Sequence, residues 1–196
     1  MMIKRSLLSI AVAATLFNAA PDAMAPDKND DKKDRSCLAV VAGSVQQPWN
    51  GGKNDAEKKF GRLEAPEFSA AAVLDVKFAI VFSKKVAEQF SGVHVVEFRV
   101  YTPQGHLYQS LSIPMTSDSG LEGQRHPVPG YPDPMPVQVL KPIHRGNGHG
   151  MFAEVTLPVA GTSIVGNSLY GDWKAEAFVA DEIAPCGQQA SFTITQ

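Results

Sequence analysis

The sequence predicts an all-β fold, an antiparallel β-sandwich of about seven or eight short strands. Two observations favour this fold class. Apolar and polar residues alternate with a period of two in several separate segments, as they do in half-buried strands. Turns rich in proline and glycine separate these segments, and no long segment carries the apolar repeat of a helix.

The first 25 residues have the features of a secretory signal peptide. Lys4 and Arg5 precede an apolar run from Leu7 to Phe17, and residues 23–25 offer the small side chains that a signal peptidase recognises. The run is shorter than the roughly 20 residues that a bilayer requires. We therefore expect a periplasmic or secreted protein with no integral membrane segment after cleavage. The alternative is a retained anchor, because Pro26 hinders cleavage directly before it.

The mature chain begins with a charged segment and contains two cysteines. Residues 26–36 carry no apolar side chain apart from a proline, which predicts a disordered leader. Residues 37–196 are predicted to form a single domain. In an exported protein the pair Cys37 and Cys186 favours a disulfide that ties the first strand to the last hairpin. Two separate buried thiols are the alternative.

The first third of the domain predicts two strands and a short helix. Residues 37–45 are a short apolar run that fits a first strand, and residues 64–68 are predicted to be extended. A short helical connector with Ser83 as its cap is predicted for residues 83–90. The clearest alternation lies in residues 71–82, where one face of the strand carries Leu74, Val76, Phe78, Ile80 and Phe82.

The next two strands form the clearest hairpin. Residues 94–102 and 107–113 alternate on both sides of the turn Thr102-Pro103-Gln104-Gly105. In the first of these strands the pattern places Val96, Phe98 and Val100 inward and Glu97, Arg99 and Tyr101 outward.

A long loop rich in proline is predicted for residues 115–136. Six prolines between residues 127 and 142 exclude a central strand, because proline cannot donate a hydrogen bond to a neighbouring strand. Residues 137–140 are predicted as a short edge strand. The segment 127–132 fits either a recognition sequence or a cover for a sheet edge, and both interpretations stay open.

Three further strands close the fold, at residues 151–157, 173–179 and 192–194. This set of strands and turns is typical of an immunoglobulin-like sandwich. The pattern Gly171-x-Trp173, followed by alternation to Asp181, resembles the terminal strands of bacterial immunoglobulin-like and macroglobulin-like domains. The resemblance covers about 25 residues of 196. It implies a tryptophan in the core and an adhesive or structural role.

Composition and motifs argue against catalysis. The formal net charge of −2 favours neither a nucleic-acid binder nor a membrane-surface binder. Serine-hydrolase and phosphate-binding motifs such as Gly-x-Ser-x-Gly and Gly-x-x-x-x-Gly-Lys are absent. Glu97, Glu154 and Glu176 are predicted on outward faces, where solvated carboxylates are ordinary. We therefore expect no enzyme, no catalytic residue and no cofactor.

A copper site is the alternative chemistry. Imidazole and thioether groups are good ligands for Cu(I), and the candidate ligands are Met135, His144, His149 and Met151. The step His149-Gly150-Met151 resembles that of periplasmic copper-carrying sandwich domains, although the His-Met pair that those proteins carry upstream is missing here. Met151 also fits the inward face of its own strand, where it is simply a core residue.

The sequence therefore favours a non-enzymatic structural or protein-binding module whose partner is an unknown envelope or extracellular protein. Tyr101, Tyr108 and Tyr131 are the candidate partner-binding residues, and Phe178 is predicted on the same outer surface. The alternative is that the loop 115–135 covers these aromatic residues.

Overall fold

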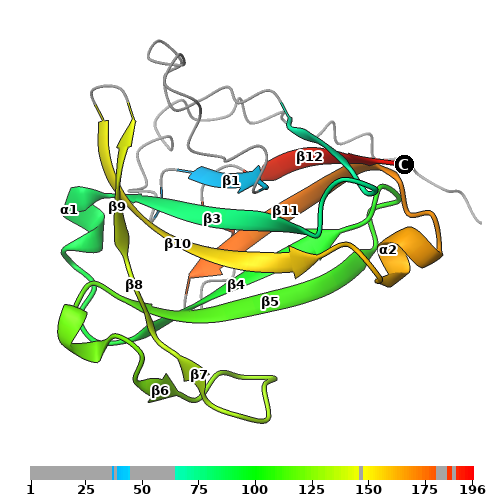
Figure 1. The fold of residues 1–196 in the computed structure, drawn as a ribbon. Coiled ribbons are helices and arrows are strands. Elements are labelled where there is room, and N and C mark those ends of the chain that lie inside the picture. Colours follow the sequence, from blue (N-terminus) through cyan, green and yellow to red (C-terminus); the bar gives the residue numbers. More distant parts are fainter. Residues whose placement is uncertain (1–36, 38, 45–64, 146–147, 180–184, 187–188) are drawn as a thin grey trace, which may run out of the picture. The chain divides into compact units, whose positions relative to one another are not determined.

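Two β-sheets account for most of the described chain (Figure 1). The computed structural model describes residues 37, 39–44, 65–145, 148–179, 185–186 and 189–196. The predicted signal peptide and the charged leader lie outside these residues. All of the described residues belong to one compact unit.

The first sheet has four strands, and each neighbouring pair is antiparallel. Its order is β1 (Ala39–Gly43), β3 (Asp75–Ser83), β10 (Gly148–Pro158) and β9 (Lys141–Arg145).

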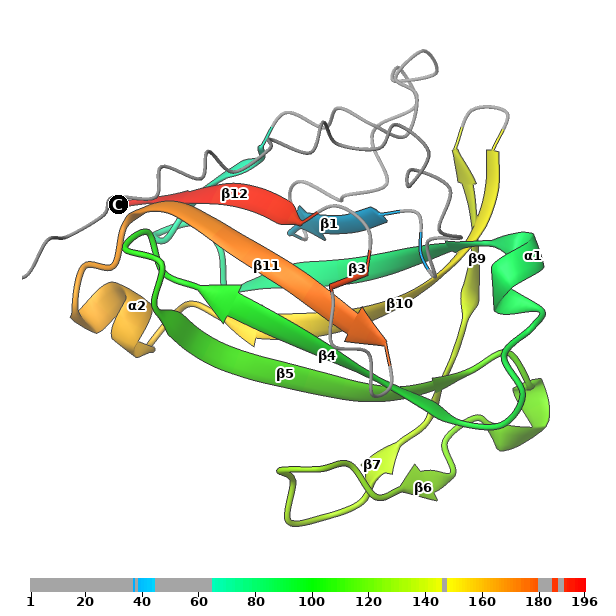
Figure 2. The same ribbon diagram turned by 180° about the vertical axis from the view of Figure 1, so that it is seen from behind.

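The second sheet has six strands and is antiparallel except at its two edges. Its outermost strands, β2 and β8, each pair in parallel with their neighbour. Figure 2 shows β12, β11, β4 and β5 side by side. The sheet order is β2 (Glu67–Ser69), β12 (Ala190–Thr195), β11 (Gly171–Val179), β4 (His94–Tyr101), β5 (Leu107–Thr116) and β8 (Gln138–Val139).

Short elements complete the described chain. Within it there are twelve strands, more than the sequence predicts, because several pieces of two or three residues are too short to show a period. These short elements are β6 (Arg125–His126), which pairs with β7 (Met135–Pro136), and the helices α1 (Lys84–Ala87), η2 (Ser119–Leu121) and α2 (Ser163–Gly166). No helix in the described ranges is long and apolar enough to cross a bilayer.

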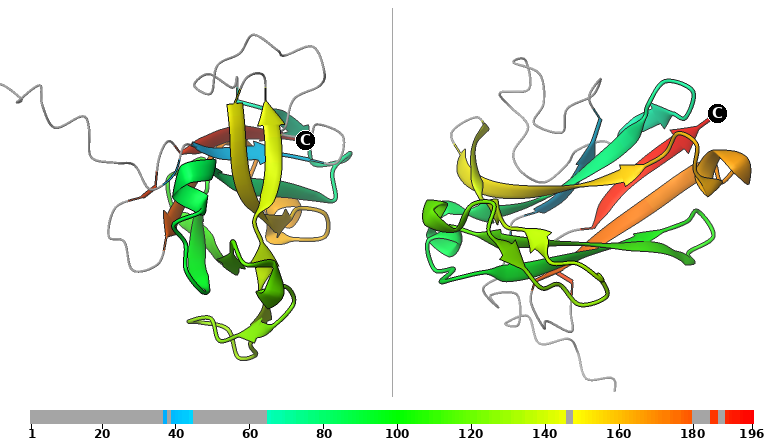
Figure 3. Two further views of the ribbon diagram at one scale, coloured as in Figure 1. Left: turned by 90° about the vertical axis from the view of Figure 1, so that its left-hand side faces the viewer. Right: turned by 60° about the horizontal axis from the view of Figure 1, so that its bottom comes forward.

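The two sheets lie face to face (Figure 3). The side chains on their inner faces share one aromatic core. The ring of Phe78 in β3 lies 5.3 Å from that of Phe192 in β12 and 6.3 Å from that of Phe98 in β4. Trp173 stacks on Phe192 at 6.2 Å, and its Nε1 donates a hydrogen bond to the carbonyl of Leu169. The core therefore joins the sheets through large side chains whose polar atoms have partners.

The disulfide between Cys37 and Cys186 is present, as the sequence predicts. Its two Cα atoms are 5.6 Å apart, and both side chains are buried in the core. Cys37 precedes β1 of the four-stranded sheet, whereas the backbone N–H of Cys186 donates to Ala177 in β11. The bridge thus links the beginning of one sheet to the other sheet.

Most predicted strands are confirmed with shifted ends. The strand predicted at residues 94–102 and the inward positions of its apolar side chains are found in β4. The predicted cap of α1 is also found, because the Ser83 hydroxyl accepts a hydrogen bond from the Val86 N–H at 3.2 Å. The short edge strand predicted at residues 137–140 corresponds to β8.

The prediction for β3 is wrong in two respects. Leu74 does not face the core: it precedes the strand, its side chain is 77% exposed, and its carbonyl accepts the N–H groups of Val159 and Ala160. The strand is also buried on both faces. Ala79 and Val81, on the face predicted to be polar, form a second apolar cluster with Val41 and Ile143.

Candidate functional site

The outer face of the six-stranded sheet gathers polar and aromatic side chains from its central strands. Strand pairing places Arg99 of β4 opposite Ser110 of β5 on one side and Glu176 of β11 on the other. Residues two apart in a strand lie on the same face. We call the following set the outer-face cluster: Glu97, Arg99, Tyr101, Glu176 and Phe178.

Arg99 is held in place by two neighbours. Its Nε and Nη2 donate to the two carboxylate oxygens of Glu97, each at 3.0 Å, in the paired geometry that suits guanidinium and carboxylate. Its guanidinium carbon lies 4.1 Å from the centre of the Phe178 ring, a cation–π contact. The hydrogen bonds from Arg99 lower the pKa of the Glu97 carboxyl against the opposing effect of burial, and the Ser110 hydroxyl lowers it further.

The same ion pair raises the pKa of the Arg99 guanidinium, mainly through the hydrogen bonds to Glu97. Both groups are therefore charged at neutral pH. Their side chains are 39% and 33% exposed, so the pair lies at the surface and its charges are partly solvated.

Tyr101 lies on the same face at the end of β4. Burial raises the pKa of its phenol, and the nearby Glu176 carboxylate, which accepts a hydrogen bond from it, raises the pKa further. Because the phenol stays protonated, it donates a hydrogen bond to Glu176.

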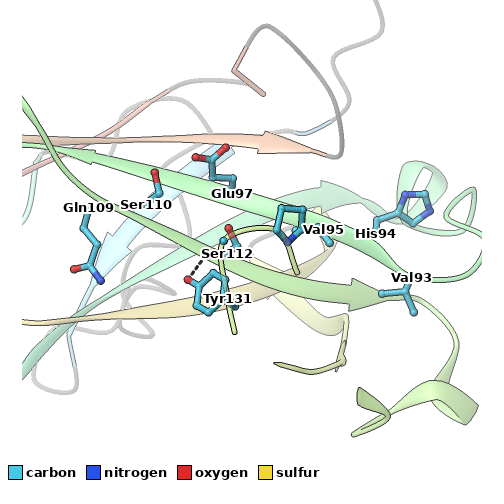
Figure 4. Close-up of a pocket in the computed structure, with 10 residues that line it drawn as sticks. Val93, His94, Val95, Glu97, Gln109, Ser110, Ser112 and Tyr131 are labelled. Atoms are coloured by element: carbon cyan, nitrogen blue, oxygen red, sulfur yellow. Dashed lines mark hydrogen bonds between the residues drawn. The ribbon is translucent and has the colours of Figure 1, made fainter. Parts of the chain in front are cut away.

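An open hollow of about 860 Å³ adjoins the cluster (Figure 4). Its floor includes Val95 and Glu97 of β4 and Ser110 and Ser112 of β5, and the turn Pro129-Gly130-Tyr131 also lines it. The phenol oxygen of Tyr131 accepts a hydrogen bond of 2.9 Å from the backbone N–H of Ser112. Gly130 adopts a φ of 84°, which other residues rarely tolerate.

Neither a protein-family model nor a curated protein matches this chain. Function is therefore inferred from the side chains themselves.

The three predicted partner-binding tyrosines do not form one surface. Tyr101 belongs to the outer-face cluster, and Tyr131 lies at the edge of β5. Tyr108 is turned the other way: its ring packs edge-on against Trp173 at 5.2 Å, and its hydroxyl lies 2.9 Å from that of Ser163. The predicted outward position of Tyr108 is wrong because the β4–β5 pairing is irregular between Val100 and Tyr101.

The predicted position of Phe178 on the outer face is correct, but its predicted exposure is not. The residue is only 5% exposed. The guanidinium of Arg99 lies over its ring. The sequence prediction missed this contact and the Glu97–Arg99 pair. A charge pair two residues apart on one strand face is the signal from which the pair could have been found.

The predicted copper ligands are divided between different parts of the fold. The backbone of β9 and β10 places His144 opposite His149, and β6 and β7 place His126 opposite Met135. Figures 1 and 2 show β7 far from the end of the β9–β10 hairpin. Met151 packs against the core, as the alternative interpretation expects.

Two further observations limit a metal site. Met115, the other methionine of this region, is fully buried in the core. In the part of the chain that the structure describes, no three His, Cys, Asp or Glu side chains come together as a metal site.

Proposed function

We propose that this chain is an exported, non-enzymatic immunoglobulin-like module that binds another protein through its outer-face cluster. Two sheets on a common aromatic core support the immunoglobulin-like architecture. The disulfide supports export, because such bonds persist in oxidising compartments.

The observation that carries the proposal is the fixed position of Arg99. Arginine and tyrosine are enriched among the residues that dominate binding energy at protein interfaces. A side chain already held by Glu97 and Phe178 loses little conformational entropy when a partner binds. Tyr101 lies two residues further along β4, so the cluster presents two such side chains on a rigid sheet.

Affinity capture with the purified protein tests this proposal. The protein is immobilised and exposed to the extracellular and envelope fractions of its source, and bound proteins are quantified by mass spectrometry. We expect Arg99→Ala and Tyr101→Ala each to reduce capture of the same partner at least tenfold, as expected for residues that dominate an interface.

Arg125→Ala is the matched control, because Arg125 is exposed and its strand, β6, belongs to a different sheet from the strands of the cluster. Equal capture by the wild type, both cluster variants and the control would contradict the proposal. Thermal unfolding of each variant verifies that the fold is intact.

A periplasmic copper-binding protein is the second candidate, and one observation favours it. His144 and His149 occupy directly opposite positions of the β9–β10 pair. Two imidazoles and the sulfur of Met151 suit Cu(I).

Titration with Cu(I) against a chromophoric competitor distinguishes this candidate. His149→Ala and Met151→Ala weaken binding in this proposal, whereas His106→Ala, in the β4–β5 turn, leaves it unchanged. Equal affinity for Cu(I) in all three variants would rule out this copper site.

A further inference from the structure

The hollow beside the outer-face cluster contains a buried hydroxyl group without a partner. Ser112 lines the hollow and is only 7% exposed. Its backbone N–H donates to Tyr131, but within the described residues its side-chain hydroxyl has no hydrogen-bond partner. The Ser110 hydroxyl, two residues earlier, does have one, the carboxylate of Glu97. Buried polar side chains nearly always have a partner, so the Ser112 hydroxyl is free to bind a molecule that enters the hollow.

Two further polar groups lie beside this hydroxyl. The phenol oxygen of Tyr131 accepts the Ser112 N–H at 2.9 Å, and in the described part of the chain the phenol proton has no acceptor. Glu97 lies directly opposite Ser112 in the β4–β5 pairing. Because the Ser112 N–H turns away from β4, this is the kind of antiparallel pair whose side chains lie closest. Figure 4 shows Ser112 between Glu97 and Tyr131.

The charges around the hollow favour a neutral ligand. Among the described residues that line it, Glu97 is the only carboxylate, and neither lysine nor arginine is present. An anionic ligand therefore finds no cation there. The charge of Glu97 is already compensated by Arg99, which donates to both of its carboxylate oxygens, so a cation is attracted only weakly. Each carboxylate oxygen has a second lone pair and still accepts a hydrogen bond from a neutral donor.

The lining also defines what a neutral ligand has to offer. Glu97 accepts hydrogen bonds, the Tyr131 phenol donates one, and the Ser112 hydroxyl does both. Val95 and Pro129 add apolar surface beside these groups. A saccharide fits this combination, because each of its hydroxyl groups both donates and accepts while its ring C–H groups are apolar. The volume of about 860 Å³ lies within the range of small-molecule sites.

We propose that the hollow binds a neutral saccharide. The carboxylate of Glu97 and the hydroxyls of Ser112 and Tyr131 form hydrogen bonds with sugar hydroxyls, and Val95 and Pro129 pack against the sugar C–H groups. A neutral peptide fits less well. Peptides are commonly held by a strand edge, by a hydrophobic groove or by a groove lined with aromatic rings, whereas the described lining of this open hollow has a single phenol ring.

This inference adds a small-molecule site to the proposed protein-binding surface. The two share Glu97, but Ser112 and Tyr131 do not belong to the outer-face cluster. Variants of these two residues therefore test the saccharide site without removing Arg99 or Tyr101, on which the proposed function depends.

Isothermal titration calorimetry of the full chain tests the proposal. The probes are three neutral trisaccharides (maltotriose, cellotriose and chitotriose), the anionic trigalacturonic acid and a neutral tripeptide with both ends capped. We expect at least one neutral trisaccharide to bind at millimolar concentration. Trigalacturonic acid is expected not to bind, because its carboxylates meet Glu97 and no cation. The capped tripeptide is also expected not to bind.

Ser112→Ala removes the unpartnered hydroxyl and keeps the backbone N–H that donates to Tyr131. We expect it to weaken binding of the trisaccharide on the order of fivefold, as the loss of one neutral hydrogen bond does. Tyr131→Phe removes the phenol and is expected to weaken binding by a similar factor. Ser191→Ala is the matched control, because Ser191 is exposed on β12 of the same sheet and does not line the hollow.

Circular dichroism verifies that each variant is folded. If Ser112→Ala does not fold, the wild type replaces it: its Ser112 and Tyr131 amide signals in ¹H–¹⁵N NMR spectra are expected to shift during the titration, whereas that of Ser191 stays in place. Three results would overturn the inference. They are no binding of any neutral trisaccharide, equal affinity in the wild type and both hollow variants, and binding of trigalacturonic acid or the capped tripeptide in preference to the neutral trisaccharides.

Discussion

The two faces of β4 and β11 differ in what they contribute. On the inner face, Phe98 and Trp173 are fully buried against the other sheet. On the outer face, Arg99, Tyr101 and Glu176 are partly exposed. Glu176 accepts a hydrogen bond from Tyr101 and interacts electrostatically with Arg99. The same strands thus secure the fold on one side and hold a polar surface on the other. Because alternate residues point to opposite faces, substitutions separate the two contributions cleanly.

The largest difference is expected from Trp173→Ala. This change removes the largest fully buried side chain of the core, and we expect a loss of about 4 kcal/mol in the free energy of unfolding. Urea unfolding followed by circular dichroism measures it. Leu107→Ala is the control, because Leu107 is 55% exposed and its loss is expected to cost less than about 0.5 kcal/mol.

Removal of the disulfide tests how much this bond contributes to the stability of the buried core. The double variant Cys37→Ala, Cys186→Ala is expected to lose about 3 kcal/mol, because the unfolded chain regains the freedom of a closed loop of 149 residues. Urea unfolding of the wild type with and without reductant gives the matched comparison. An unchanged urea midpoint in the double variant would show that side-chain packing alone stabilises the region around Cys37 and Cys186.

Phe178→Ala tests whether a residue on the outer face can contribute to stability as much as a residue on the inner face. Phe178 lies on the outer face, yet its ring is almost fully buried beneath Arg99. We expect a loss of about 2 kcal/mol, between the core and the surface values. Leu74→Ala, which removes an exposed apolar side chain, is the control. A loss as large as that of Trp173→Ala would erase the distinction between the faces.

The smallest effect on stability is expected from Arg99→Ala. An ion pair at the surface contributes less than about 1 kcal/mol. The pKa of Glu97 in the folded protein is below its ordinary value of 4.5, so this contribution is present above that pH and is lost as the pH falls through the folded pKa.

In Arg99→Ala most of this acid-dependent loss disappears, because Arg99 is the main cause of the lowered pKa of Glu97. Unfolding by urea at neutral pH and at about pH 3 therefore measures it as a difference between wild type and variant. Glu97→Gln is expected to give the same result, since it removes the titrating group itself. If the free energy of unfolding depends on pH in the same way in the wild type and in both variants, Glu97 is not the source of the acid-dependent loss of stability.

Much of the fold can be predicted from alternation alone. Val76, Phe78, Ile80 and Phe82 follow a period of two and are all buried in the shared core. Leu74 continues the same period but lies outside the strand, because alternation does not mark where a strand begins. The parallel edges formed by β2 and β8 could not be predicted, since strands of two or three residues carry no period.

The candidate site is harder to predict because it depends on contacts between strands. Alternation places Phe178 outward, and it does lie on that face, but its burial depends on Arg99 in the neighbouring strand. Tyr108 is displaced by an irregular step in the pairing that its own sequence does not mark. The Tyr131 contact joins residues 19 apart through a loop whose path cannot be read from composition.

The disulfide also decides how the protein responds to mechanical tension. A force applied between the chain before Cys37 and Gln196 passes through the sulfur–sulfur bond and bypasses the 149-residue loop that it closes. Of the described strands, all except β12 lie within that loop. Among the described strands, β12 alone can then be pulled away from its neighbours β11 and β2. The strands inside the loop bear no load.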